Sequence, residues 1–365
     1  MDPRILRNRK FTVIANGTIS QQEEVMSGVP QGTVLAAILF IIMIADIDEK
    51  IKECMVRCFA DDTRVSKKIE EETDKQKLQE ALNLIFEWAE ENLMVFNEDK
   101  FEQLTYGNTE NVTITAYKNP SDIDIKNGEI VKDLGIVTNK SMSFKEHIRS
   151  VVLACKRISG MILRTFTTRD PEIMLKLFNT YIRSKIEYCC CIWSPNLQCE
   201  IDELERLQKT FTSKINGLED KDYHERLQIL NLYSLERRRE RYLIIYAWQM
   251  IEGIKENVLN LESTKNGRSR AIWSRPIRWS YKGKKIKHSS RSIVHNSTAK
   301  RMERLFNCLP LHIKNIENKT VETFKRALDK WLQTIPDLPK IDNYGARVAA
   351  VNNSIINQAA VARRQ

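Results

Sequence analysis

The sequence predicts an α+β protein, in which an antiparallel sheet with helices on one face is followed by a mainly α-helical region. Two observations support this class. Short alternating apolar runs bounded by turn residues fill most of the first 140 residues, whereas amphipathic helical runs follow one another from Ser143 onward. The 365 residues suffice for two or three domains with a sizeable buried core.

The first predicted elements are a hairpin and a helix. An apolar strand at residues 11–14 reaches the turn Asn16-Gly17 and returns to Val25, which is typical of a β-hairpin. Residues 34–45 have no polar side chain but are well short of the roughly 20 residues that span a bilayer, so they predict a buried helix. Residues 1–10 carry charge and no apolar stretch, so we expect no signal peptide.

Two adjacent acids, Asp61 and Asp62, follow an apolar run and precede alternating residues, which predicts a second hairpin with both acids at its tip. Neighbouring strand residues point to opposite faces, so adjacent carboxylates share one site only where the chain turns. Such a pair can hold Mg²⁺ or Mn²⁺ together with substrate phosphates. The simpler interpretation is a polar turn, because Asp is a common turn former.

Residues 73–89 predict a helix that covers the sheet. Thr73 and Gln76 have the spacing of a capping box, and the apolar positions fall on one face, namely Leu78, Ala81, Leu82, Ile85, Trp88 and Ala89. Residues 101–106 and 112–117 then alternate as strands, and residues 131–137 form a further strand around Asp133-Leu134-Gly135.

Four helices are expected in the second half of the chain. Ser143 and Glu146 form a capping box before the first, Asp170-Pro171 begins the second, and residues 235–250 form the fourth. The buried faces of the first three are Ile148, Val151, Val152, Cys155 and Ile158, then Met174, Leu177, Phe178, Tyr181 and Ile182, then Leu204, Leu207, Phe211 and Ile215. Residues 341–365 have no strong period, so we expect a loosely ordered tail.

The eight cysteines include three in succession, Cys189, Cys190 and Cys191. A zinc site needs two matching pairs of ligands at short spacings, and the sequence supplies no second pair near Cys54 and Cys58. Buried reduced thiols are the better interpretation, and they suit an intracellular protein, cytoplasmic or nuclear.

The basic charge is concentrated in one segment. Residues 265–301 carry twelve Lys or Arg and no Asp or Glu, so the formal net charge of +10 leaves the remainder of the chain near −2. Aromatic residues alternate with these cations, and this composition suits phosphates and stacked bases of single strands or structured RNA. The alternative is a solvated basic loop. The candidate contacts are Arg268, Arg270, Trp273, Arg275, Arg278, Trp279, Lys282, Lys284, Lys285 and Lys287.

A helical stretch carries a second group of charges, namely Arg237, Arg238, Arg239 and Arg241 with Glu236 and Glu240. Some of them should pair along the helix. Consecutive arginines point around most of a helix, so we expect Arg237, Arg238 and Arg241 either to contact phosphates or to form a solvated face.

A glycine-rich loop precedes the apolar helix, and it contains Ser27, Gly28, Pro30, Gln31 and Gly32. Two glycines and a proline make a backbone that another molecule can approach closely. The segment SGVPQGTVLAAILF followed by FADDT resembles the fifth and sixth palm motifs of the reverse transcriptases of non-LTR retrotransposons, the jockey-like branch in particular.

This resemblance implies a catalytic role for the motif residues. Asp61 would bind the metal with Asp62 in support, and the loop would shape the nucleotide and template pocket. Lys100, in FNEDKFEQLTYG, matches a lysine that is thought to assist the pyrophosphate leaving group, with an exposed strand-edge lysine as the alternative. VKDLGIV resembles the primer-grip hairpin, with Leu134 and Gly135 at its centre. The implied partners are an RNA template, a DNA primer and deoxynucleoside triphosphates, with no membrane.

The family uses a third carboxylate in a strand upstream of the loop, and before Ser27 this chain has only Asp2, Glu23 and Glu24 in other contexts. We therefore expect a truncated palm that lacks the fingers and the first catalytic motif, binds Mg²⁺ weakly and is inactive as an RNA-directed DNA polymerase. The alternative function is a non-catalytic RNA- or DNA-binding remnant. Resemblance extends along IRSKIEYCCCIWSP and IDELERLQKTFTSKI into the family's thumb.

The expected division of the chain has five parts. Residues 1–140 form the partial palm, 141–260 the helical thumb, 261–304 the basic segment with aromatic residues, 305–340 a C-terminal helical segment, and 341–365 the tail.

Overall fold

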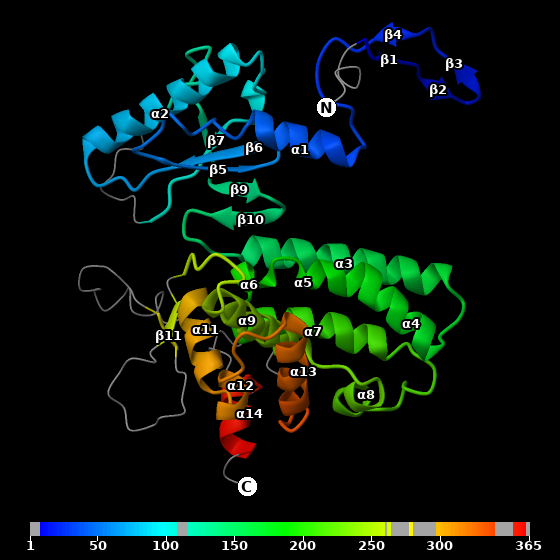
Figure 1. Cartoon of the computed structure of the whole chain (residues 1–365). Coiled ribbons are helices and arrows are strands. Elements are labelled where there is room, and N and C mark those ends of the chain that lie inside the picture. The colour runs from blue at the N-terminus through cyan, green and yellow to red at the C-terminus, as the bar shows by residue number, and fades with distance from the viewer. Residues whose placement is uncertain are drawn as a thin grey trace. The chain divides into compact units, whose positions relative to one another are not determined.

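The computed structural model describes residues 8–107, 116–259, 261–263, 277–279, 297–339 and 353–362. The chain divides into two compact units, of which the first holds residues 1–131 with 139–141 and the second holds residues 132–138 with 142–365. The described residues are mostly helical with small two-stranded sheets, as Figure 1 shows, so the α+β class is confirmed. No described helix is long and apolar enough to cross a membrane.

The N-terminal residues form two nested strand pairs. β1 (Lys10–Phe11) pairs with β4 (Glu23–Glu24), and β2 (Ile14–Ala15) pairs with β3 (Thr18–Ile19), both antiparallel. Asn16 and Gly17 join β2 to β3 with φ angles of 50° and 78°. Two positive φ angles match the twist of a two-residue hairpin turn. The predicted Asn-Gly hairpin is confirmed.

Helix α1 (Val34–Met43) begins where the Thr33 hydroxyl accepts a hydrogen bond from the Ala36 N–H at 3.1 Å. The prediction that this helix is buried is wrong, because Ala36 alone among its residues is buried and Val34 is 83% exposed. Apolar composition indicates that a helix can be covered, but it does not supply the covering element. No described element covers the face with the exposed side chains Val34, Ile38, Ile41, Ile42 and Met43.

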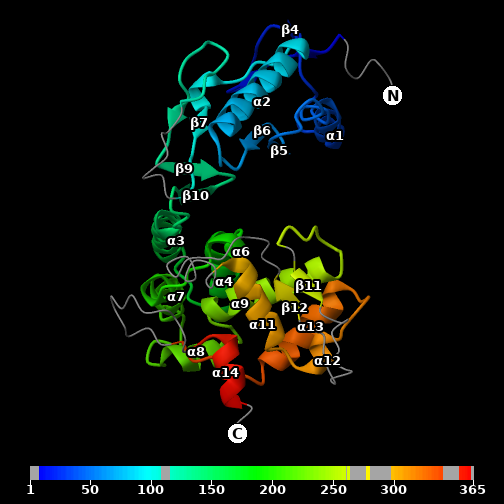
Figure 2. The same cartoon turned by 90° about the vertical axis from the view of Figure 1, so that its left-hand side faces the viewer.

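A hairpin and a helix form the core of the first unit. β5 (Met55–Phe59) pairs with β6 (Asp62–Ser66), and α2 (Glu72–Glu91) packs on them in both Figure 1 and Figure 2. The buried residues of this core include Ile47, Ile51, Val56, Ala81, Ile85, Trp88 and Ala89. The predicted helix over the hairpin is therefore confirmed.

The start of α2 differs from the predicted capping box. Thr73 lies inside the helix, and the Asp74 carboxylate accepts hydrogen bonds from the backbone N–H groups of Glu70 and Glu71 at 3.0 and 3.1 Å. Lys67 forms an ion pair with Asp74 at 3.5 Å. A charged carboxylate is a stronger acceptor than a hydroxyl, which explains why the cap is formed two residues earlier than predicted.

The described strands do not form one continuous antiparallel sheet, contrary to the prediction. Each described sheet has two strands, and β7 (Glu102–Gln103) pairs with β8 (Lys126–Asn127) in parallel. Most of the predicted strand 112–117 lies outside the described residues. The predicted strand 131–137 is instead a hairpin, β9 (Ile130–Asp133) and β10 (Ile136–Asn139), because Leu134 and Gly135 turn the chain with φ angles of 44° and 85°.

The second compact unit, residues 132–138 with 142–365, is mainly helical and is called the helical unit below. Its first core joins helices α3 to α7 and the start of α9. The bounds are α3 (Lys145–Thr165), α4 (Pro171–Leu177), the π-helical stretch η3 (Phe178–Arg183), α5 (Ser184–Glu187), α6 (Cys190–Trp193), α7 (Gln198–Thr212), α8 (Tyr223–Ile229) and α9 (Leu235–Ile251). The buried faces predicted for α3 and α7 are confirmed by this core, in which Val151 and Ile158 are partly buried. The Asp170 carboxylate caps α4 as predicted. The N-cap of α3 is Phe144, one residue after the predicted Ser143, whose hydroxyl accepts a hydrogen bond from the Lys145 N–H at 3.4 Å.

The buried face predicted for the second helix is wrong at one position. Met174, Phe178 and Ile182 are buried, but Tyr181 is 52% exposed. A π-helical turn contains more residues than an α-helical turn, so the stretch Phe178–Arg183 shifts the phase of the face. Ile182 and Ile186 then point inward, and Tyr181 points to solvent.

The second core of the helical unit surrounds α9, which lies at its centre in Figure 2. The other elements are β11 (Leu261–Ser263), β12 (Ile277–Trp279), α11 (Thr298–Asn307), α12 (Leu311–Lys314), α13 (Val321–Leu332) and α14 (Ile355–Ala362). The Trp248 and Phe324 rings stack with their centroids 4.6 Å apart. The tail is not loosely ordered where it is described, because Ile355 and Ala359 of α14 are buried in this core.

All eight cysteines have free thiols, which agrees with the prediction of reduced cysteines. Only Cys155 and Cys190 are buried core residues, whereas Cys58 and Cys189 are exposed. Burial raises the pKa of the Cys155 thiol to about 11, which keeps it protonated and unreactive.

Candidate functional site

The predicted catalytic acids lie at the tip of the β5–β6 hairpin. Phe59 pairs with Asp62, so Ala60 and Asp61 form the two-residue turn. Ala60 has a φ of 51°, a left-handed conformation that costs a non-glycine residue roughly 1 kcal/mol. Asp61 and Asp62 are both exposed, and neither carboxylate has a hydrogen-bond or ion-pair partner among the described residues. The tip therefore presents two adjacent acids to solvent.

The glycine-rich loop is open, as its composition predicted. Gly28 and Gly32 have φ angles of 80° and 88°, and a Cβ added at either would meet no atom within 4 Å. The Arg9 guanidinium donates hydrogen bonds to the carbonyl oxygens of Ser27 and Gly28, and the Thr33 hydroxyl donates to Pro30 O at 3.0 Å. Arg9 is a residue that the sequence reasoning missed, because no pattern links it to a loop 18 residues away.

The loop and the acids belong to the same compact unit, but no hydrogen bond or ion pair between described residues joins them. Lys100 ends the short 3₁₀ helix Glu98–Lys100 and is exposed, so it is not a strand-edge residue. The neighbouring Glu98 carboxylate accepts hydrogen bonds from Asn119 and Ser121 at 2.6 and 3.0 Å. These contacts fix the turn that carries Lys100.

The donor set at the tip fits a hard divalent cation only in part. Two carboxylates with open positions for phosphate oxygens and water suit Mg²⁺. Within the described ranges, however, no group of three or more His, Cys, Asp or Glu side chains is placed to hold a metal ion. A further ligand would have to come from substrate phosphates or from another segment.

Two residues of the hairpin that resembles the primer grip, Leu134 and Val137, have hydrogen-bond partners within the helical unit. The Tyr188 hydroxyl donates to the carbonyl oxygen of Leu134 at 3.0 Å, and the Val137 N–H donates to His147 Nδ1 at 3.3 Å. Burial lowers the pKa of His147, which favours the neutral ring that can accept this bond. Tyr188 and His147 were not predicted, because both contacts join positions that are distant in sequence.

Three arginines of α9 have protein partners from other elements. Arg237 is 1% exposed and donates to the carbonyl oxygens of Leu332 and Ile335 at 3.2 and 2.6 Å. Arg238 pairs with Glu187, and Arg241 pairs with Asp329 at 2.5 and 2.6 Å. The expected pairing along the helix and the expected solvated face are both wrong, since these partners lie 51 to 98 residues away.

A row of cations on α3 was missed by the sequence reasoning. Arg149, Lys156, Arg157 and Arg164 are exposed, as are the apolar side chains of Leu153 and Met161. The described residues provide no ion-pair partner within 4 Å for Arg149, Lys156 or Arg157. Reading the outward positions of the predicted helix, as well as its buried face, would have found this row.

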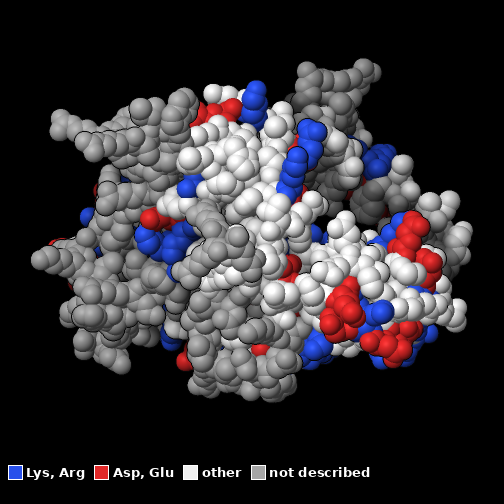
Figure 3. All heavy atoms as spheres, turned by 90° about the horizontal axis from the view of Figure 1, so that it is seen from below, with Lys and Arg blue, Asp and Glu red and all other residues white. Residues whose placement is uncertain are grey.

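Most of the basic segment lies outside the described residues, including Arg268, Arg270, Trp273, Arg275, Lys282, Lys284, Lys285 and Lys287. The backbone of Arg278 and Trp279 pairs with β11. Lys300 and Arg301 at its end belong to α11, where Lys300 pairs with Glu303 and Arg301 donates to Ser194 O at 2.9 Å. On the face drawn in Figure 3, described charges of both signs lie close together.

Residues 3–144 match the family model described as "Reverse transcriptase (RNA-dependent DNA polymerase)". This part of the chain carries the loop and the acids, and it is similar to reverse transcriptases. Between 57% and 65% of the chain is distantly similar to the RNA-directed DNA polymerases of the jockey and X-element mobile elements. The resemblance found in the motifs is thereby confirmed.

Three curated relatives show the extent of this similarity. The RNA-directed DNA polymerase from mobile element jockey of Drosophila funebris is 28% identical over 228 residues, 57% of this chain and 24% of the relative. Its Drosophila melanogaster counterpart is 29% identical over 227 residues, 58% of this chain and 24% of the relative. The probable RNA-directed DNA polymerase from transposon X-element of Drosophila melanogaster is 22% identical over 250 residues, 65% of this chain and 27% of the relative.

The chain thus spans about a quarter of the length of the curated relatives that it matches. No solved structure gave a significant match.

Proposed function

We propose that these 365 residues are part of a retrotransposon RNA-directed DNA polymerase, with a partial palm in residues 1–140 and a helical thumb in residues 141–260. The observation that carries this proposal is the exposed Asp61-Asp62 pair at a hairpin tip, inside the region that matches the reverse-transcriptase family. The basic segment 261–304, the helical segment 305–340 and the tail 341–365 complete the proposed division.

In this proposal Asp61 and Asp62 hold Mg²⁺ or Mn²⁺ weakly. The metal ion would neutralise charge on the phosphates during nucleotidyl transfer. Ser27, Gly28, Pro30, Gln31 and Gly32 shape the nucleotide and template pocket with their open backbone. Lys100 lies near the leaving group, and the backbone of Leu134 and Gly135 holds the primer end. The partners are an RNA template, a DNA primer and deoxynucleoside triphosphates, in the cytoplasm or the nucleus.

A second candidate function is nucleic-acid binding without catalysis. The exposed cations of α3 and the basic segment favour it, since both offer positive charge for phosphates. Arg237 is not included in this interface, because its guanidinium is enclosed by the protein and bonded to backbone carbonyls. Arg238 and Arg241 would have to leave Glu187 and Asp329 to reach a phosphate.

We predict that the basic segment contributes most of the electrostatic binding. Replacing Lys282, Lys284, Lys285 and Lys287 with Gln should make the slope of log affinity against log salt less negative by up to about 2.8, because each contact with single-stranded nucleic acid contributes about −0.7. The measurement is fluorescence anisotropy of a labelled single-stranded RNA between low and moderate salt. A matched variant carries Gln at Arg149, Lys156 and Arg157, and a larger change there would assign the interface to α3 instead.

We predict that limited proteolysis of the full chain removes residues before about 130 first. The first unit has strands of two to five residues and an exposed apolar helix, whereas the helical unit has two large buried cores. Local opening is easiest where few apolar contacts must be broken. Fragments should be identified by mass spectrometry, and a surviving first unit with early cleavage throughout residues 143–335 would contradict the expectation.

A further inference from the structure

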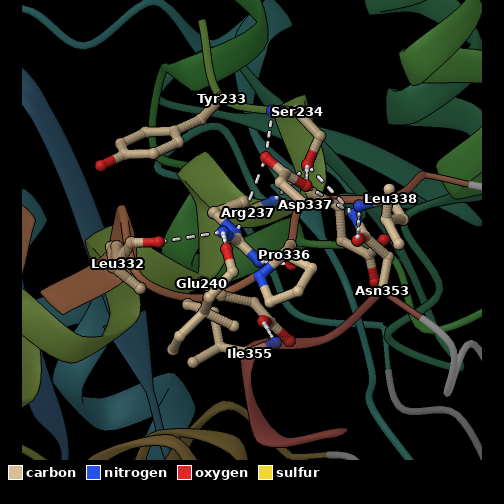
Figure 4. Close-up of polar contacts among 12 residues, drawn as sticks. Tyr233, Ser234, Arg237, Glu240, Leu332, Pro336, Asp337, Leu338, Asn353 and Ile355 are labelled. Carbon is tan, nitrogen blue, oxygen red and sulfur yellow. Dashed lines mark hydrogen bonds and ion pairs between the residues drawn. The ribbon is translucent and has the colours of Figure 1, made fainter. Parts of the chain in front are cut away.

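Hydrogen bonds at the start of segment 353–362 hold it against α9 and the residues that follow α13. The Ser354 hydroxyl and the Ile355 N–H donate to the two carboxylate oxygens of Glu240 at 2.7 and 2.6 Å. The Asn353 side chain donates to Asp337 at 2.9 Å and accepts from the Leu338 N–H at 2.7 Å, as Figure 4 shows. Ile355 is fully buried beneath these contacts.

Glu240 therefore caps the N-terminus of α14 from a different helix. A carboxylate at this position is favourable, because the free N–H groups of the first turn carry positive partial charge. Glu205 of α7 plays the same part for α9, since it accepts from the N–H groups of Leu235 and Glu236 at 3.1 and 3.3 Å. The N-termini of α14 and α9 are thus both capped by buried carboxylates, those of Glu240 and Glu205.

A small cavity lies beside these caps. Its lining residues are Gln198, Ile201, Asp202, Glu205, Glu236, Pro339 and Asn353. The space in it amounts to about 10 Å³, which corresponds to about one water molecule. Three of the lining side chains are carboxylates, and Asn353 of segment 353–362 also lines the cavity.

Burial favours the protonated forms of Glu205, Glu236 and Glu240. It raises the pKa of Glu205 to about 7 and that of Glu236 to about 8, and it also raises the pKa of Glu240. The charged and titratable groups that face Glu236 or Glu240 are Asp202 and Glu205 of α7, Arg237 and Arg239 of α9, Arg301 of α11, and Asp337 after α13.

The two acids of α9 differ in their surroundings. Glu240 is stabilised in its charged form by the Ile355 N–H, Ser354 and Arg301. Glu236 has no hydrogen bond or ion pair to its carboxylate among the described residues, and it faces Glu240 and Glu205. Like charges one turn apart repel, so Glu236 is the member of the pair that carries the proton.

We propose that residues 353–362 form a latch, which is docked while Glu236 is protonated and is released when Glu236 ionises beside Glu205 and Glu240. Ionisation calls for water in the cavity, and Asn353 is a lining residue that belongs to neither α7 nor α9. Release of the segment breaks its hydrogen bonds to Glu240, Ser234 and Asp337 and admits that water. Docking is thereby coupled to the uptake of one proton.

The sign of the pH dependence follows from the raised pKa of Glu236. An acid whose pKa is higher in the docked state binds its proton more tightly there, so docking is complete at low pH and is lost as the pH rises through about 8. One coupled proton limits the change in the docking equilibrium to about tenfold per pH unit.

The test is hydrogen exchange of the α14 amides in the full chain between pH 6 and 9, with rates divided by the intrinsic rate at each pH. Protection of residues 357–362 should fall by up to about tenfold per pH unit as the pH approaches the pKa of Glu236 from below, and it should level off above about pH 8. Two matched variants, one turn apart on α9, should behave in opposite ways. Glu236→Gln should keep the segment docked to pH 9, and Glu240→Gln should lower its protection at every pH.

Unchanged protection of α9 residues 243–250 shows that each variant keeps its fold. If either glutamine variant disturbs α9, Ser354→Ala decides instead, because it removes one hydrogen bond at the segment itself and should lower α14 protection at pH 6 about fivefold. Constant wild-type protection from pH 6 to 9 overturns the latch, as does a Glu236→Gln profile that matches the wild type or unchanged protection in Ser354→Ala.

Discussion

A DNA primer annealed to an RNA template is expected to remain unextended by the purified 365-residue chain, with Mg²⁺ or with Mn²⁺. Two-metal phosphoryl transfer requires two ions held about 3.5 to 4 Å apart, one at the attacking hydroxyl and one at the triphosphate. Asp61 and Asp62 supply two carboxylates at an exposed tip, and the described residues bring no third acid to them. The ion that activates the primer hydroxyl is left with too few ligands.

The measurement is incorporation of labelled nucleotide, beside the double variant Asp61→Ala, Asp62→Ala as the contamination control and an active reverse transcriptase as the positive control. Extension by the parent chain that the double variant abolishes would contradict the prediction. Another acid would then complete the site, and Glu23 and Glu24 of β4 are the candidates. Asp46 is a weaker one, because its carboxylate already accepts the Trp88 indole N–H at 3.0 Å.

The largest loss of stability is expected from Arg237→Met, which should lower the free energy of unfolding of the helical unit by about 3 to 5 kcal/mol. The side chain is 1% exposed and bonds to the carbonyl oxygens of Leu332, Ile335 and Pro336. Methionine fills a similar volume but removes the donor to these carbonyl oxygens and the ion-pair partner of the Asp337 carboxylate, which keeps its hydrogen bonds from Ser234 and Asn353.

The matched control is Arg241→Met on the same helix, whose partner Asp329 is about one-third exposed. Loss of the Arg241–Asp329 ion pair should lower the free energy of unfolding by about 1 kcal/mol or less, because a partly solvated ion pair contributes little. Urea unfolding followed by the exchange of α9 amides measures both variants in the helical unit alone. Equal midpoints for the two variants would show that the Arg237 contacts do not stabilise the fold.

The turns and helix caps that depend only on neighbouring residues were predicted correctly in the cases that follow. Asn16-Gly17 supplies the two positive φ angles of a hairpin turn, and Asp170-Pro171 supplies both a cap and a fixed φ at the start of α4. The Asp61-Asp62 hairpin follows in the same way from a short apolar run and a turn. Each of these depends on neighbours within four residues, which the sequence displays directly.

The failures concern partners that are distant in sequence. Arg237 was expected at a surface because arginine is usually exposed, whereas its acceptors are carbonyls at the end of α13, more than 90 residues away. Helix α1 was expected to be buried because of its composition, but composition does not specify a covering element. The apolar pattern of segment 353–362 is too short to predict a helix, and it gives no sign that Glu240 would cap this segment.

The contacts of β10 bear on how the helical unit could be produced as a separate fragment. Ile136 is buried in its first core, and Val137 and Leu134 are bonded to His147 and Tyr188. A recombinant fragment that starts at residue 141, where the run of helices begins, would lack this hairpin and would expose the apolar surface beneath Ile136. A fragment that starts at about residue 128 keeps both strands of the hairpin, so the unit that folds is longer at its N-terminus than the succession of helices suggests.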